Sequence, residues 1–216
     1  MKITIGYLYY DLLNLYGDSG NIKTLKYHLE EQGINVEIKN LTINDQKNFD
    51  DLDLIYIGSG TNDNIIVALE DLKKDKKKLE KYIKDNKFIL STGNSVELFG
   101  NYVITKDKNK ALGVLDYVCM KQKRIVKDVK TDTDIIDSKI IGFENHDGRI
   151  LNFDEDIVKI GNFYGTYIIG PLLVRNPKLC SYFVKQLITS KKEDFKFKDE
   201  NYDLDMKAYN KTVETI

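Results

Sequence analysis

The chain has 216 residues, of which 42% are hydrophobic, enough to form the core of one domain of α/β size. Its 33 basic and 34 acidic residues leave a net charge of −1, which excludes a general electrostatic attraction to nucleic acids or anionic membranes. The two cysteines and two histidines show no metal-ligand spacing and no apolar run is long enough to cross a bilayer, so we expect a reduced, cytoplasmic protein without a metal cluster or cofactor.

The first half of the chain alternates strands with helices. A turn-rich loop, residues 11–21, follows the first strand, and Asp18 or Ser19 is predicted to cap the next helix. That helix carries Ile22, Leu25 and Leu29 on one face and ends at Gly33. Because strand, helix and strand follow one another, we expect a parallel sheet. Its predicted strands are residues 2–10, 34–38, 52–57 and 88–90.

Two further helices are expected before residue 88, separated by a basic run at residues 73–78. Nucleic-acid sites usually need a wider basic surface with aromatic residues. We therefore interpret this run as a solvated helix face or a corner between two helices.

The second half consists of short β-like runs, which we expect to form antiparallel hairpins at the edge of the sheet. Residues 142–149 are interpreted as a turn between two of them. A late strand breaks at Gly170-Pro171, a helix begins at Asn176, and a terminal amphipathic helix carries Tyr202, Met206, Tyr209 and Val213. We expect the terminal helix to dock on its own domain rather than on a partner.

The stretch from Phe88 to Gly100 has the order strand, tight turn and helix. Such a turn in an α/β fold lifts one side chain above the sheet, beside backbone N–H groups that stabilise an anion. The raised residue is predicted to be Thr92. A second glycine-rich turn, residues 58–62, follows the preceding strand, and ligand sites of open α/β sheets lie at such strand ends.

Four stretches together resemble one family. Residues 11–21 (D-L-L-N-L-Y-G-D-S-G-N) resemble its opening D-L-M-N-x-Y-G-D-x-G-N, and residues 57–60 (I-G-S-G) resemble its G-G-G-Q-D turn. Residues 142–149 (G-F-E-N-H-D-G-R) are similar to G-F-E-N-H-x-G-R, and residues 165–173 (G-T-Y-I-I-G-P-L-L) to G-T-Y-L-H-G-P-L-L. The chain thus resembles the cobyric-acid-synthase-like class I glutamine amidotransferases, and among them the amidotransferase subunit of lipid II isoglutaminyl synthase.

This resemblance implies an open, mostly parallel sheet flanked by helices, as in class I glutamine amidotransferases and flavodoxin-like folds, with antiparallel edge hairpins. It implies an amidotransferase-like domain over residues 1–190, followed by a charged segment and the amphipathic helix over residues 191–216. It also implies a Mur-ligase-like partner and peptidoglycan precursor amidation, although cobalamin-type chemistry stays open.

The resemblance fails at the reacting groups. It places Thr92 at the position of the family's nucleophilic cysteine, Ile169 at that of its histidine base, and Thr61 at that of the glutamine in the glycine turn. A threonine hydroxyl needs an adjacent base to attack, and isoleucine cannot be one. No catalytic residue is therefore expected to be intact.

A binding pocket is nevertheless expected to survive. The resemblance places Arg124 at the family's substrate-binding arginine, whose fork can hold a carboxylate of a glutamine-like molecule in two bonds. Gly58, Gly60 and Gly93 are expected to supply an anion pocket. His146 is interpreted as a turn histidine, although a role as a replacement base stays open.

Our first interpretation is a degenerate amidotransferase-like subunit that binds or regulates an amide-forming partner. One alternative is an active glutamine amidotransferase that uses an unrecognised nucleophile. Cys119 and Cys180 are expected to be buried hydrophobic residues rather than that nucleophile. The other is a stand-alone small-molecule sensor that uses the Arg124 pocket.

Overall fold

The computed structural model describes residues 1–199 and 202–216. Its centre is a six-stranded sheet in the order β2-β1-β3-β4-β10-β9, in which only β9 runs antiparallel to its neighbour. The expected open, mostly parallel sheet is confirmed. Its strands are β1 (Lys2–Leu8), β2 (Asn35–Leu41), β3 (Leu54–Ile57), β4 (Phe88–Thr92), β9 (Ile157–Ile160) and β10 (Phe163–Thr166).

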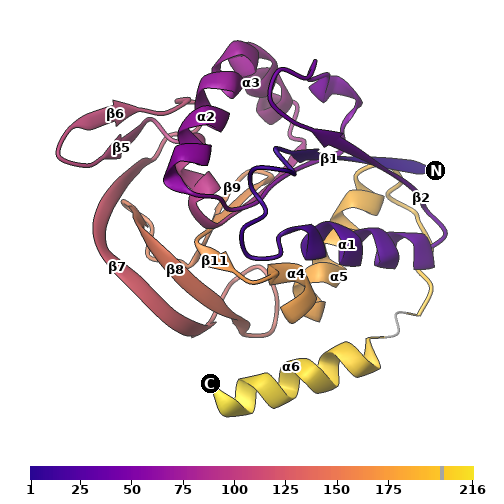
Figure 1. Ribbon diagram of the computed structural model, residues 1–216. Coiled ribbons are helices and arrows are strands. Elements are labelled where there is room, and N and C mark those ends of the chain that lie inside the picture. The colour runs from indigo at the N-terminus through magenta and orange to yellow at the C-terminus, as the bar shows by residue number, and fades with distance from the viewer. Residues whose placement is uncertain (200–201) are drawn as a thin grey trace.

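Helices cover both faces of this sheet (Figure 1). Successive side chains of a strand point to opposite faces, so Leu54 and Tyr56 pack in one apolar cluster while Ile55 and Ile57 pack in the other. The first cluster is completed by α1 (Ser19–Glu31), α4 (Leu172–Arg175) and α5 (Pro177–Thr189), and the second by α2 (Asn62–Leu72), α3 (Lys76–Lys84) and the 3₁₀ helix Gly93–Leu98.

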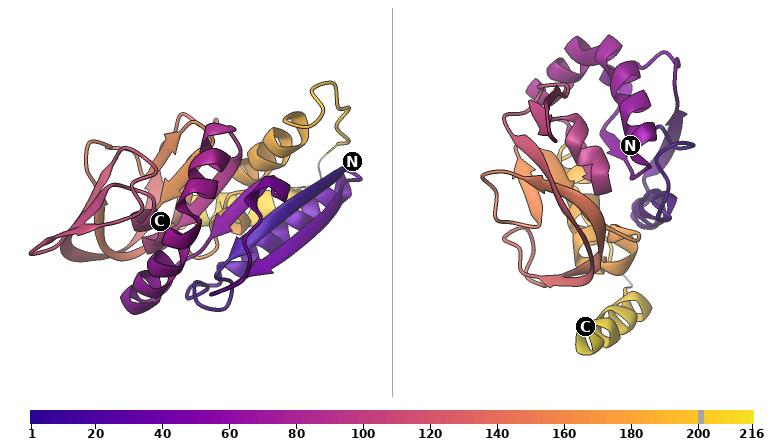
Figure 2. Two further views of the ribbon diagram at one scale, coloured as in Figure 1. Left: turned by 90° about the horizontal axis from the view of Figure 1, so that it is seen from above. Right: turned by 60° about the vertical axis from the view of Figure 1, so that its left-hand side comes forward.

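In the second half of the chain, β9 and β10 form an antiparallel hairpin at the edge of the first sheet, as expected, and the other strands build a separate five-stranded sheet. Its order is β11-β8-β7-β5-β6, with β5 (Tyr102–Ile104), β6 (Lys108–Lys110), β7 (Val118–Thr131), β8 (Ile140–Ile150) and β11 (Ile168–Ile169). Figure 2 shows the long β7–β8 ribbon curving beside the central sheet. The predicted turn at residues 142–149 is wrong, because these residues form the middle of β8 and pair with both β7 and β11.

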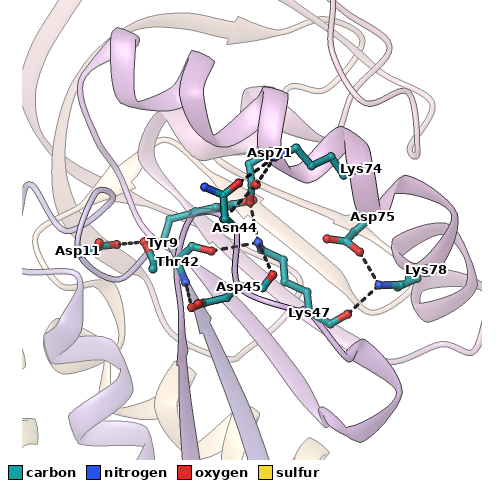
Figure 3. Close-up of polar contacts among 10 residues, drawn as sticks. All are labelled: Tyr9, Asp11, Thr42, Asn44, Asp45, Lys47, Asp71, Lys74, Asp75 and Lys78. Atoms are coloured by element: carbon teal, nitrogen blue, oxygen red, sulfur yellow. Dashed lines mark hydrogen bonds and ion pairs between the residues drawn. The ribbon is translucent and has the colours of Figure 1, made fainter.

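The basic run is a corner between helices, as expected. A 3₁₀ turn, Lys73–Asp75, joins α2 to α3. Beneath this corner Lys47 is only 1% exposed, and its ammonium group lies 2.6 Å from Asp71 Oδ2 (Figure 3). Asp71 also accepts hydrogen bonds from the Tyr9 hydroxyl at 3.1 Å and from the exposed Lys74 at 3.0 Å. This cluster ties the loop after β2, which contains a further 3₁₀ turn (Phe49–Asp51), to the end of α2.

The terminal helix α6 (Asp203–Thr215) lies at the α4–α5 end of the molecule. The Tyr209 hydroxyl donates to the Lys139 carbonyl at 2.7 Å, and Lys130 donates to the carbonyl of Val213 at 3.0 Å. The expected docking of this helix on its own chain is therefore confirmed. None of the described helices combines the length and apolar character needed to cross a membrane.

Candidate functional site

A cavity of about 260 Å³ lies where the carboxyl ends of β3 and β4 face the second sheet. Open α/β sheets bind ligands at this edge, where strand order reverses. The structure brings together six residues singled out from the sequence, all of which line the cavity: Gly60, Thr61, Gly93, Arg124, His146 and Ile169. Gly58 does not line the cavity. It packs so closely against the loop after β1 that a β-carbon there would come within 2.4 Å of the Leu13 carbonyl oxygen.

The apex of the strand-to-helix turn is Gly93. Thr92 is the last residue of β4 and has extended backbone angles (φ −119°, ψ 144°), whereas Gly93 has φ +68°. A residue that changes direction this sharply between strand and helix presents its side chain at the top of the sheet. The expectation that Thr92 is raised is therefore wrong: Thr92 is fully buried and does not line the cavity.

A side chain on Gly93 would point toward Ile169 and Ser59. Its β-carbon would lie 3.1 Å from Ile169 Cγ2 and 2.4 Å from Ser59 Cβ. Two carbon atoms do not approach to 2.4 Å, so the Ser59 side chain occupies space that any side chain at position 93 would need. The turn thus contains neither a nucleophile at its apex nor room for one.

The anion pocket predicted from Gly58, Gly60 and Gly93 is also partly closed. The Gly60 N–H donates to Asn94 Oδ1 at 3.1 Å, and Asn94 Nδ2 donates back to the Gly60 carbonyl at 2.8 Å. An oxyanion hole needs donors aimed at the developing charge. The Gly60 donor instead points at an amide of the same chain.

Thr92 belongs to a buried polar cluster beneath the cavity. Its hydroxyl donates to Asp18 Oδ1 at 3.0 Å and lies 2.8 Å from the Tyr56 hydroxyl, while the Ser59 hydroxyl donates to Asp18 Oδ2 at 3.1 Å. Burial raises the pKa of the Asp18 carboxyl, against the opposing effect of these donors and of the Tyr16 N–H. A carboxylate beside a hydroxyl has the partners of an activated nucleophile, but this pair is buried below the cavity floor.

Asp18 occupies the N-cap position of α1, as predicted, but its side chain turns inward and makes no cap hydrogen bond. Asn14 Oδ1 instead accepts from the Ser19 N–H at 2.9 Å. Asn21 extends the cluster by donating to Tyr56 at 2.7 Å and accepting from the Leu173 N–H at 2.7 Å. These hydrogen bonds therefore hold the loop of residues 11–21 against the buried polar cluster beneath the cavity.

Arg124 reaches the cavity from an irregular part of β7. The pairing of β7 with β8 shifts register between Lys121 and Ile125, and such bulges re-aim side chains. Arg124 Nε donates to Asn145 Oδ1 at 2.7 Å, and Asn145 Nδ2 donates to the Tyr16 hydroxyl at 2.9 Å. This chain of bonds fixes the guanidinium plane at the cavity wall.

Comparison with known proteins decides the family. Residues 4–176 match the CobB/CobQ-like glutamine amidotransferase domain. The chain belongs to this family. It is 28% identical over 213 residues to subunit GatD of lipid II isoglutaminyl synthase (glutamine-hydrolyzing) from Streptococcus pneumoniae, covering 88% of this chain and 82% of the relative. It is 29% identical over 227 residues to the subunit of the same name from Staphylococcus aureus, covering 96% and 93%.

Solved amidotransferases share the fold. One glutamine amidotransferase structure aligns with a TM-score of 0.55 at 16% identity, covering 85% of this chain and 98% of the other. A second, from Thermotoga maritima, aligns with a TM-score of 0.50 at 10% identity, covering 99% and 92%. At these identities the alignments show the fold alone.

Neither cysteine lines the cavity of this amidotransferase domain, whereas the hydroxyl-bearing residues Ser59 and Thr61 do. Cys119 and Cys180 are buried, as expected, and burial raises the pKa of the Cys119 thiol to about 12. Ser91 and Ser95 are fully buried, with their hydroxyl oxygens 2.8 Å apart. His146 does line the cavity, although on a strand rather than in a turn.

Proposed function

We propose that this chain is a non-hydrolysing amidotransferase-like subunit that works beside an amide-forming, Mur-ligase-like partner in the amidation of a peptidoglycan precursor. The two relatives named as lipid II isoglutaminyl synthase subunits cover most of the chain and support this pathway. One observation carries the loss of chemistry: the apex of the elbow is a glycine whose missing side chain would face an isoleucine.

Glutamine hydrolysis needs an attacking group, a base and donors for the oxyanion. We infer that Gly93, rather than Thr92, stands at the nucleophile's place, because it has the elbow conformation and lines the cavity. Ile169, facing it, has no proton acceptor. Removing the nucleophile or base of a cooperating unit costs on the order of a millionfold in rate. The hydroxyl of Thr92 cannot replace them from its buried position.

The remaining role of such a subunit would be to bind a ligand. Arg124 and the backbone groups around Gly60 and Gly93 remain around a cavity large enough for an amino-acid-sized molecule. Arg124 is already oriented by Asn145, which leaves its terminal nitrogens for a carboxylate. We propose that an intact glutamine-like molecule occupies this cavity without being cleaved.

The test is ammonia release from glutamine by the purified chain, alone and with a candidate Mur-ligase-like partner. We expect no release above that of a protein-free blank in either sample. Glutamine-dependent release above the blank in either sample would contradict the proposal, whether or not a Thr92→Ala variant abolishes it. Co-elution of the two proteins on size-exclusion chromatography tests the partner separately, since association does not require hydrolysis.

The retained cavity also favours a second candidate, a stand-alone sensor of a carboxylate-bearing small molecule. The two functions differ in their need for a partner. A sensor is expected to show ligand-dependent thermal stabilisation as an isolated chain and no co-elution with the ligase-like protein.

A further inference from the structure

A second cavity, of about 310 Å³, lies against the opposite face of β8. Alternate residues of a strand point to opposite faces, so Glu144, His146 and Gly148 line this second cavity whereas Asn145 and Asp147 line the first. His146 touches both. None of the functions discussed above uses the second cavity.

His146 has a defined tautomer in this wall. Its side chain is 8% exposed and its ring stacks on Tyr167, with centroids 4.2 Å apart. Nδ1 lies 2.8 Å from the Gly148 carbonyl oxygen. Because a carbonyl oxygen can only accept, Nδ1 carries the proton, and in the neutral ring Nε2 is a lone-pair acceptor. This Nε2 is buried and makes no hydrogen bond within the described part of the chain.

Glu144 presents a second acceptor beside the first. Its Oε1 lies 3.6 Å from His146 Nε2, too far for a direct hydrogen bond, while Lys127 lies 3.3 Å from its other oxygen. The Glu144 side chain is 8% exposed. Two buried acceptors at this separation can both be satisfied by one group that carries several N–H donors.

The surroundings favour a positively charged donor. Asp154, Glu155 and Asp156 line the rim, which gives the cavity more carboxylates than cations even with Lys127 and Arg149 present. No set of three His, Cys, Asp or Glu side chains in the described residues is placed to hold a metal ion. An ammonium group meets these requirements, because it is small, positively charged and carries several N–H donors.

We propose that this second cavity binds the primary ammonium group of a small amine or amino acid, which donates to His146 Nε2 and Glu144 Oε1. The proposal does not depend on loss of glutaminase activity or on the first cavity.

The first test reads the protonation of His146 in the ligand-free chain. The protein has two histidines, so His146→Gln assigns the imidazole ¹⁵N signals. In the neutral ring we expect protonated Nδ1 and unprotonated Nε2, with the Nε2 signal moving when ethylammonium chloride is added. A protonated Nε2 in the free protein would mean that the ring pairs directly with Glu144, and the proposal would be wrong.

The second test uses the same signals to measure affinity for ethylammonium. Loss of a hydrogen bond to a charged group predicts about a tenfold or larger weakening in Glu144→Gln. Glu193→Gln, an exposed change outside the cavity, is the control and is expected to bind nearly as the unmodified chain does. Equal weakening in both variants, equal binding of tetramethylammonium, or no binding of ethylammonium overturns the proposal. Thermal unfolding of Glu144→Gln checks that the variant is folded.

Discussion

Asn94 and Gly60 are joined by two hydrogen bonds, one in each direction between the amide side chain and the backbone. These bonds hold the two glycine-rich turns of the cavity together. They also occupy the Gly60 N–H group, which the sequence predicts as part of an anion pocket. A single side chain therefore both joins the two turns and occupies this donor.

We expect Asn94→Ala to lower the free energy of unfolding by about 1–3 kcal/mol, since each bond of this kind contributes about 0.5–1.5 kcal/mol. Urea denaturation measures this value. Asn62→Ala, on the same cavity wall but exposed, is the control and is expected to change stability by less than about 0.5 kcal/mol. Equal effects of the two substitutions would show that the Asn94 bonds are not formed in solution.

Lys47 and Lys74 offer a matched comparison around one acid. Both contact Asp71, but Lys47 is 1% exposed and Lys74 is 62% exposed. Breaking a buried pair leaves an uncompensated charge, so Lys47→Met is expected to cost about 3–5 kcal/mol, whereas Lys74→Met is expected to cost less than about 1 kcal/mol. Chemical denaturation of both variants checks this difference, and similar losses would contradict it.

Asp71 also predicts acid sensitivity. Burial alone would raise its pKa, but the hydrogen bonds from Lys47 and Lys74 outweigh burial and lower the pKa to about 2. The folded state therefore favours the charged carboxylate. Its contribution to stability is full above the ordinary value of 3.8 and is lost as the pH falls toward 2. The free energy of unfolding of Asp71→Asn, measured from about pH 6 to about pH 2.5, should not show this pH-dependent loss.

Asp18 should behave in the opposite way. Burial raises the pKa of its carboxyl, so the folded state binds a proton more readily than the unfolded state. Stability from this group falls as the pH rises from 3.8 through the raised pKa. We expect Asp18→Asn to be more stable relative to the unmodified chain at neutral pH than at about pH 4. Parallel stability profiles for the two proteins would contradict this assignment.

Reactivation tests which residue stands at the nucleophile's place. We expect Thr92→Cys with Ile169→His to stay inactive, because position 92 is buried. Gly93→Cys with Ile169→His and Ser59→Gly is expected to release ammonia from glutamine, since Ser59→Gly removes the 2.4 Å approach. Adding Asn94→Gly frees the Gly60 donor and is expected to raise the rate by about 100-fold or more. Activity in the Thr92→Cys variant would overturn the assignment of Gly93.

Much of the first sheet could be predicted from the sequence because its signals are local. Gly33 ends α1 with φ +80°, and the apolar alternation of β3 matches the two clusters on either side of it. Residues 142–149 could not be assigned in this way. They contain Gly, Asn, His and Asp, which rarely favour strands, and only pairing with β7 and β11 holds them extended.

The candidate site was likewise predictable from the sequence only in part. Proximity of Gly60, Gly93, Arg124 and Ile169 was predictable, since all lie in recognisable motifs. The inward turn of Asp18 was not, because its partner Thr92 is 74 residues away in the chain. Nor could the sequence distinguish Thr92 from Gly93 as the apex, which depends on a single backbone angle.

The contact between the absent Gly93 side chain and Ser59 bears on how the domain can evolve. A mutation that restored a cysteine at position 93 alone would meet the Ser59 β-carbon. A mutation that restored a histidine at position 169 alone would find nothing to deprotonate. Under the loss of glutaminase activity proposed above, neither single substitution is expected to produce catalysis, and the first is expected to lower stability. Glutamine cleavage would therefore require several simultaneous substitutions, which makes its recovery by single mutations improbable.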